Sequence, residues 1–434
     1  MTRQPSPVAP RTIATPRMSA LLLALGCGLG ACSARPQPSP ADEADKASVR
    51  PTLADDEPKP AVDGGTPAPQ LVGPAGDPFA VADREIDPAP PADVPMAPVG
   101  APPTPAKAFD AKHAPRAVDR FDEYVNVRAL ASSADRIYFA DMTGRDGKIY
   151  SKIRAVDLDD GEVSSVRPDD GRIDALALAS DASELSWVSM PLDGGAPALW
   201  TMPLSPTAEE GEPVVADANY GTANHLTRLG DALFFVLPVT QQGRKGGIGR
   251  VPAGGGEKLA VGRSLGPAFS PVTDGERLYF MAHRRGAPDV VYSVDPTGSD
   301  LRAHVSVPRG IVALQVDGTH VYWARIGVDG RSTEVGRVPK APGEGAPEVL
   351  VTIADVVFET MAVSDAGIWL GTSAAEPAGK VVQLDKATPA NPRVVLEAPR
   401  IWKVFAQGDR VFVHVERPGD DGQAHRAFVE LRPS

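Results

Sequence analysis

The sequence predicts an all-β fold, a seven-bladed β-propeller closed by an N-terminal strand and preceded by a disordered tether rich in proline and alanine. Three observations predict it. A triplet made of an aliphatic residue, a middle residue that is usually aromatic and another large apolar residue recurs seven times. Asp-Gly pairs, which favour tight hairpin turns, lie between many of the apolar runs. No stretch of convincing length has the apolar period of an amphipathic helix.

The first 31 residues have the layout of an export signal. Three arginines precede an apolar run, Met18–Leu29, that is shorter than the ~20 residues needed to span a bilayer. The run ends in Leu-Gly-Ala-Cys at residues 29–32, which resembles the lipobox of bacterial lipoproteins. The resemblance implies a lipid on Cys32, and Ser33 after it indicates the outer membrane. The alternatives are an ordinary signal peptide and, with a poorer fit, acylation at Cys27.

Residues 32–116 form the predicted tether. Nineteen prolines, many alanines and several acidic residues lie between Ser33 and Arg116, with few large apolar side chains. Such a composition buries too little surface to offset the entropy lost on ordering. We expect a disordered, extended stalk that lifts the following domain from the membrane, and a proline-rich ligand for a partner is the alternative.

Residues 117–434 form the predicted domain, and its units are about 45 residues long. The first members of the seven triplets are spaced by 48, 48, 45, 43, 47 and 43 residues. The triplets begin at Ile137, Leu185, Leu233, Leu278, Val321, Ile368 and Val411. This spacing is the length of a propeller blade.

Each unit contains four apolar runs, as a four-stranded blade requires. One run precedes the triplet, another follows about 13 to 16 residues after it, and a last run follows in six of the seven units. The seventh unit ends too early for its outer strand. We expect residues Val118–Phe121 to supply that strand and so to remove an exposed sheet edge.

The repeats resemble those of TolB-like propellers and, more loosely, of propellers with Tyr-Trp-Thr-Asp repeats. Tyr322-Trp323 matches the start of the latter motif, whereas Ala324-Arg325 departs from it. The pattern of Val321–Trp323 followed by Gly336–Pro339 also resembles repeats of predicted propeller lipoproteins. The resemblance implies the architecture and leaves the function open.

The motif search gives no catalytic cluster, and we expect no cofactor. There is no P-loop, no Gly-x-Ser-x-Gly elbow and no His-Glu-x-x-His pair. Asp157, Asp159 and Asp160 before Gly161 depart from calcium-loop spacing and are better explained by a hairpin turn. The six histidines of the domain form no short-range ligand pair, so we expect no metal site.

Basic residues in three successive blades are the main candidates for ligand binding. We expect them on the face where second-to-third strand loops lie. They are Arg244 and Lys245, then His283, Arg284 and Arg285, then Arg325 with Arg331. In a chain of net charge −12, such a basic sector suits an anionic ligand. Solvated loop charges without a ligand are the alternative.

A second set of candidates lies in loops that enter the inner strands. Asn224 and His225 precede the third inner strand, and Trp402 lies near the seventh. An exposed aromatic ring near an amide suits a sugar or a peptide. Core packing is the alternative role for Trp402.

These features together predict a membrane-anchored, non-enzymatic binding or scaffolding module of the bacterial cell envelope. We expect a monomer on the outer membrane, facing the periplasm or the outside, whose partner is an envelope protein, a glycan or peptidoglycan. The acidic charge and the export signal argue against nucleic acid. The alternative is a propeller enzyme, a lyase, lactonase or hydrolase, with its site at the mouth of the central channel.

Replacing the acylated cysteine tests the anchor. We expect Cys32→Ala to move the protein from the membrane fraction to the soluble fraction, because the lipid is the predicted attachment. Fractionation and metabolic labelling with palmitate measure this, with Cys27→Ala as the matched control. Equal labelling of wild type and Cys32→Ala would contradict the lipobox interpretation.

Overall fold

In the computed structural model each predicted repeat forms a four-stranded antiparallel sheet, and the seven sheets are the blades of a propeller. The structure describes residues 84–86, 94–100, 103–108, 116–121, 127, 129–145, 148–169, 171–191, 197–204, 214–217, 225–237, 246–283, 286–341, 343–372, 378–418 and 424–431. Within these ranges no helix is long or apolar enough to cross a membrane.

The strands follow the order that the sequence predicts. The innermost strands of blades 1 to 7 are β3 (Leu130–Ser132), β7 (Arg172–Leu178), β11 (Leu226–Leu229), β15 (Ala268–Thr273), β19 (Ile311–Val316), β23 (Thr360–Ser364) and β27 (Arg400–Gln407). The second strands, which hold the triplets, are β4 (Arg136–Arg145), β8 (Glu184–Met190), β12 (Ala232–Val236), β16 (Leu278–Ala282), β20 (His320–Ile326), β24 (Gly367–Gly371) and β28 (Arg410–Pro418).

The third strands are β5 (Lys148–Asp157), β9 (Ala198–Pro203), β13 (Ile248–Pro252), β17 (Asp289–Val294), β21 (Thr333–Pro339), β25 (Gly379–Leu384) and β29 (Ala424–Leu431). The outer strands are β6 (Val163–Asp169), β10 (Val214–Asp217), β14 (Leu259–Val261), β18 (Arg302–Val307), β22 (Glu348–Ile353), β26 (Arg393–Ala398) and, for blade 7, β2 (Arg116–Phe121). A short 3-10 helix, η2 (Arg263–Leu265), joins blades 3 and 4, and β1 (Arg84–Ile86) adds to the edge of blade 3.

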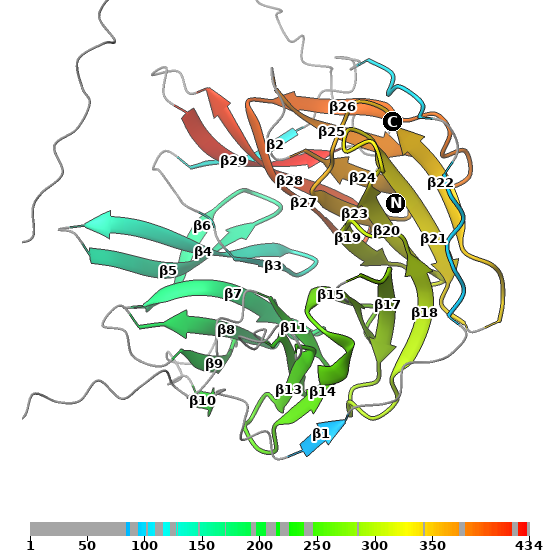
Figure 1. Cartoon of the computed structure of the whole chain (residues 1–434). Coiled ribbons are helices and arrows are strands. Elements are labelled where there is room, and N and C mark those ends of the chain that lie inside the picture. The colour runs from blue at the N-terminus through cyan, green and yellow to red at the C-terminus, as the bar shows by residue number, and fades with distance from the viewer. Residues whose placement is uncertain are drawn as a thin grey trace, which may run out of the picture. The chain divides into compact units, whose positions relative to one another are not determined.

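The innermost strands contact their neighbours in chain order from β3 to β27, around a common axis (Figure 1). Between blades 7 and 1, the Ser132 hydroxyl donates to Gln407 Oε1 at 3.2 Å. The predicted closing strand is confirmed, because β2 pairs antiparallel with β29 over Arg116–Phe121. This pairing joins both ends of the domain in blade 7 and covers an edge that would otherwise invite association.

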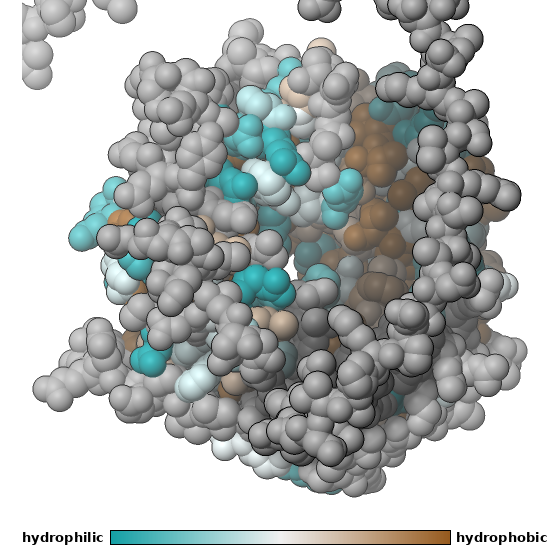
Figure 2. All heavy atoms as spheres, turned by 60° about the vertical axis from the view of Figure 1, so that its left-hand side comes forward, coloured by the Kyte–Doolittle hydropathy of each residue, from teal (hydrophilic) through white to brown (hydrophobic). Residues whose placement is uncertain are grey.

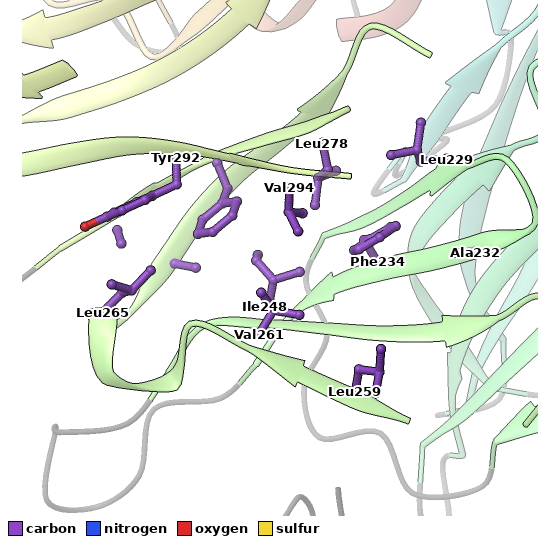
Figure 3. Packing of buried hydrophobic residues seen from close by; sticks show 13 residues of the cluster. Leu229, Ala232, Phe234, Ile248, Leu259, Val261, Leu265, Leu278, Tyr292 and Val294 are labelled. Atoms are coloured by element: carbon purple, nitrogen blue, oxygen red, sulfur yellow. The ribbon is translucent and has the colours of Figure 1, made fainter. Parts of the chain in front are cut away.

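The core consists of seven buried clusters, one between each pair of neighbouring blades. Successive side chains of a strand point to opposite faces of the sheet, so the second strand of each blade contributes residues to two clusters. In β16, Leu278 and Phe280 face blade 3, whereas Tyr279 and Met281 face blade 5. Figure 3 shows the cluster between blades 3 and 4, with Phe234, Ile248 and Val261 opposite Leu278, Tyr292 and Val294.

A repeated polar contact links blades 4, 5 and 6 at the turns between first and second strands. Asp274 accepts a hydrogen bond from the Tyr279 hydroxyl at 3.0 Å and pairs with Lys340 of the next blade. One blade further, Asp317 accepts from the Tyr322 hydroxyl at 2.8 Å and pairs with Lys386 at 2.7 Å. Tyrosine burial in an interface therefore comes with a satisfied hydroxyl group.

The prediction that residues 32–116 are a disordered tether is wrong for part of that range. Residues 84–86, 94–100 and 103–108, here called the edge strap, lie on outer strands of four blades. β1 runs parallel to β14, and single bridges join Met96 to Ser306, Thr104 to Ile353 and Lys107 to Arg393. Figure 1 shows β1 beside β14. Residues 32–83 lie outside the described residues.

The edge strap is held by main-chain hydrogen bonds, which explains why composition did not reveal it. Ala97 N donates to Ser306 O at 2.8 Å, and Thr104 N donates to Thr352 O at 2.7 Å. An outer strand carries unpaired N–H and C=O groups that any extended segment can satisfy, whatever its side chains. Disorder was predicted from the scarcity of large apolar side chains, and that criterion does not take main-chain pairing into account.

Large apolar side chains are exposed at five described positions: Met96, Val99, Val163, Phe269 and Val328. On the face drawn in Figure 2, hydrophobic residues gather in one area and hydrophilic residues lie beside them. Two of the five exposed side chains lie in the edge strap, and Phe269 is the one on an innermost strand.

Removing the edge strap tests its contribution. We expect a chain that begins at residue 109 to unfold with a free energy about 2–4 kcal/mol below that of a chain that begins at residue 84. The main-chain bonds of the strap are worth ~1 kcal/mol each, and the entropy lost on ordering the strap offsets part of their sum. Urea unfolding at neutral pH measures the difference. Identical transition midpoints in the two proteins would show that the strap adds no stability.

Candidate functional site

The candidate site is one end of the central channel, where the seven innermost strands begin. Because these strands follow one another around the ring with the same direction, their first residues gather at the same end. Side chains are exposed on or directly before several of these strands, namely His225 before β11, Phe269 in β15, Glu359 before β23, Pro399 before β27, and Arg400 and Lys403 in β27. We call His225, Phe269 and Lys403 the channel mouth.

Lys403 owes its position to an irregularity in β27. The register with β28 shifts between Ile401 and Lys403, so that Lys403 lies opposite His414. Lys403 as a residue is exposed, yet desolvation by the surrounding protein lowers the pKa of its ammonium group. It forms no ion pair with a carboxylate of the described residues. An unpaired, partly desolvated ammonium group attracts anions more strongly than one on an open surface.

His225 directly precedes β11 of blade 3 and is exposed. Its pKa is lowered first by desolvation and then by the charge of Lys403. These residues come from blades 3 and 7, which lie on opposite sides of a seven-membered ring.

Phe269 is the second residue of β15, the innermost strand next to β11. The Thr227 hydroxyl of β11 donates to Pro271 O of β15 at 3.3 Å. The β15 register shifts between Phe269 and Val272, and Ser270 has a positive φ of 50°. This irregular backbone leaves the phenyl ring 41% exposed instead of packed between blades.

Trp402, a sequence-predicted residue, is half-buried beside this mouth. The guanidinium carbons of Arg400 and Arg426 lie 3.7 and 4.2 Å from its ring centroid, and His414 stacks at 6.2 Å. Because its own chain occupies the ring, Trp402 is unsuited to stacking a sugar. The structure supports the packing role that the sequence left open.

Arg325, one of the predicted binding residues, is buried in β20 and does not lie in the exposed loop that the sequence predicted. Only 2% of it is exposed, and its Nη2 lies 2.6 Å from Glu334 Oε2 in a buried ion pair. The residue belongs to the second strand β20 and not to a loop. Its side chain therefore points into the protein, where its charge is neutralised by Glu334.

His283 is held by a carboxylate rather than left open. Its Nδ1 lies 2.6 Å from Oδ1 of Asp289, whose other oxygen accepts hydrogen bonds from the main chain of Gly310 and Ile311 at 3.0 and 3.3 Å. The pair joins blade 4 to the start of blade 5. It also orients the imidazole in the way that a carboxylate orients a general base.

The predicted basic sector is not brought together by the described residues. Arg244, Lys245, Arg284, Arg285 and Asn224 lie outside the described residues, as does Cys32. His225 is the one predicted residue that the structure places at the channel mouth. Within the described ranges, no group of three or more His, Cys, Asp or Glu side chains could hold a metal ion.

Sequence reasoning missed Lys403 and Phe269. Lys403 is the single charge within the apolar run Ile401–Phe405, and that interruption was the available signal. Phe269 carried no signal, because an aromatic residue in a strand is ordinarily core. Its exposure depends on a local register shift that a regular strand pattern does not contain.

Comparison with known proteins supports the fold. The sequence matches no protein family, and no curated protein matches it. The propeller domain of the Trilobed protease from Pyrococcus furiosus is similar with a TM-score of 0.52 and 10% identity, over 72% of this chain and 97% of that domain. TolB from Acinetobacter baumannii has a TM-score of 0.40 and 13% identity, over 62% and 79%.

A third structure, the acylaminoacyl peptidase from Pyrococcus horikoshii, has a TM-score of 0.48 and 11% identity, over 70% of this chain and 51% of that one. At such identities the likeness shows a propeller and nothing about activity. The function must therefore be argued from the site.

His414 under Trp402 predicts a pH effect on stability. Burial, followed by Arg426 and Lys403, lowers its pKa to about 3, so the folded protein holds it neutral. Its ordinary pKa is 6.5, so the unfolded chain gains a proton as pH falls below that value and stability is lost toward pH 3. The loss from this group between pH 7 and pH 5 is about 2 kcal/mol.

We expect His414→Phe to remove that part of the acid sensitivity. The Nε2 atom has no hydrogen-bond partner among the described residues, so a phenyl ring leaves no buried group newly unpaired. Urea unfolding at pH 7 and pH 5 measures the change. An unaltered pH dependence in the variant would contradict the assignment.

Proposed function

We propose that this chain is a lipoprotein of the bacterial outer membrane whose propeller binds a partner of the cell envelope at the channel mouth, without catalysing a reaction. The lipid on Cys32 anchors it, residues 33–83 link it to the propeller, and the partner is an envelope protein, a glycan or peptidoglycan. The protein acts as a monomer.

One observation carries the proposal. Lys403 and His225 are exposed near the starts of the innermost strands of blades 7 and 3, and neither forms an ion pair with a carboxylate of the described residues. Leaving a desolvated ammonium group unpaired costs stability, which a ligand bearing a negative charge would recover. The lipobox and the export signal in the sequence support the place in the cell.

Capture from membranes tests this function. The intact lipidated protein is cross-linked in cells and purified from solubilised envelopes, in parallel with a Lys403→Glu variant. We expect the wild type to retain a partner and the charge-reversed variant to lose at least about nine tenths of it, since like charges repel the anionic group. Lys152→Glu, which changes an exposed lysine of β5, is the matched control.

Equal retention by all three proteins would place binding elsewhere on the propeller. Failure of the wild type to retain any envelope component would refute the binding function. Lys403 is exposed, so the charge reversal is not expected to unfold the domain, and a thermal scan verifies this.

The pair of His283 and Asp289 favours the second candidate, a propeller lyase, lactonase or hydrolase. A carboxylate-oriented imidazole is the geometry of a general base. If this function holds, envelope extracts contain a substrate that the wild type turns over and His283→Ala does not. Turnover that survives this substitution would remove the pair from consideration.

A further inference from the structure

We propose that the edge strap is a releasable section of the chain, which detaches from the outer strands while the seven blades stay folded. Release begins at blade 3, where the first residues of the strap lie, and stops at β2, which is part of blade 7. The release itself does not depend on the proposed function. Its effect on the distance from the membrane rests on the lipid anchor that the proposed function includes.

The main-chain attachment of the strap is small at each blade. At blades 4, 5 and 6 the described strap makes two main-chain hydrogen bonds each, one donated by the strap and one accepted by it. At blade 5, Thr104 N donates to Thr352 O at 2.7 Å, and Thr104 O accepts from Ala354 N at 3.1 Å. The gain from two such bonds is of the same order as the entropy lost on ordering a short segment, so no single blade holds the strap firmly.

Side chains add little to this attachment. Within the described strap, Ala97 is the one buried residue, at 4% exposed. Ile86 and Ala106 are partly buried and pack against two of the clusters. Met96 and Val99 are 54% and 85% exposed. Apolar stabilisation scales with the area removed from water, so detachment of the strap loses little of it.

The blades keep their own pairing without the strap. Each outer strand that the strap touches, namely β14, β18, β22 or β26, is paired with the third strand of its own blade. Among the described strap residues, Ala97 alone counts among the buried members of the seven clusters. In contrast, β2 pairs with β29 along its whole length. Detachment therefore stops at β2 and leaves the ring closed.

Gly100 determines how closely the strap approaches blade 5. A Cβ atom at this position would lie 2.6 Å from Thr352 Oγ1 and 3.0 Å from Glu334 Oε2. Thr352 and Glu334 are both buried, so neither has much room to move aside in a close-packed interior. A side chain at position 100 therefore weakens the docking of the strap without changing any residue of a blade.

Release changes both the exit point and the reach of the chain. The point at which the preceding chain leaves the propeller moves from blade 3 to blade 7. Residues 84–108 span ~80 Å when fully extended, since each residue covers ~3.3 Å. With the chain anchored at Cys32, this length adds to the distance that the propeller can move from the membrane.

Hydrogen exchange of the full-length chain tests the release. We expect the amide protons of Ala97, Thr104 and Lys107 to exchange about 30- to 1,000-fold more slowly than in an unstructured peptide, because they are bonded but open locally. Amide protons of β12, β20 and β24 should exchange at least about a hundredfold more slowly still, because they open only with the whole domain. Mass spectrometry of peptic fragments at neutral pH measures both rates.

A matched pair of glycine variants tests the docking at blade 5. Gly100→Val should raise the exchange rate of the strap at least about tenfold and leave the rates of β12, β20 and β24 unchanged, because the clash lies between the strap and the rim. Gly318→Val is the control, since a Cβ atom there meets no atom within 4 Å. This control should leave all of these rates unchanged.

The outcomes separate the release from the anchor. Strap amide protons that exchange as slowly as those of β20 would overturn the proposal, because the strap would then open only with the whole domain. Exchange as fast as in an unstructured peptide, or equal strap rates in the wild type and Gly100→Val, would overturn it as well. If palmitate labelling at Cys32 fails while the strap still opens locally, the release stands and only its effect on the distance from the membrane is wrong.

Discussion

The structure depends on burying both faces of each blade against its neighbours. A single four-stranded sheet with two apolar faces cannot hide either face alone, and the seven clusters show that each face is completed by the adjacent blade. No interface is expendable, because a missing blade would open two faces at once. The pairing of β2 with β29 follows from the same requirement, since it completes the last sheet.

Polar contacts join neighbouring blades near the axis and at the turns, and they also hold the edge strap on the outer strands. Near the axis, side chains donate to the main chain of the next inner strand, as Thr360 does to Val404 O at 3.2 Å. At the turns, Asp317 joins Tyr322 to Lys386 of the next blade. At the outer rim, the edge strap supplies main-chain partners. The hydroxyl group of Tyr322, in the Tyr-Trp pair of blade 5, thus donates to an aspartate five residues earlier in the chain.

The channel mouth differs from these places because the charge of Lys403 has no ion-pair partner among the described residues. The buried charge of Arg325, by contrast, is paired with Glu334. Lys403 has no comparable partner among the described residues, and the burial around it is incomplete. Propellers place their inner strand ends at a common point, so a few unpaired side chains from distant parts of the chain become one site. A binding role needs no more than this.

The sequence by itself determined the blade number, the strand order and the closing strand, because alternation and a 45-residue period are properties of consecutive residues. It also indicated His225 near a strand entry. Only the tertiary structure decided that Arg325 is buried, that Trp402 is covered by Arg400 and Arg426, and that Lys403 is exposed beside a register shift of β27. These outcomes depend on strand register and on contacts between separate strands, which no local pattern encodes. The edge strap belongs with them, because main-chain pairing leaves little mark on the choice of side chains.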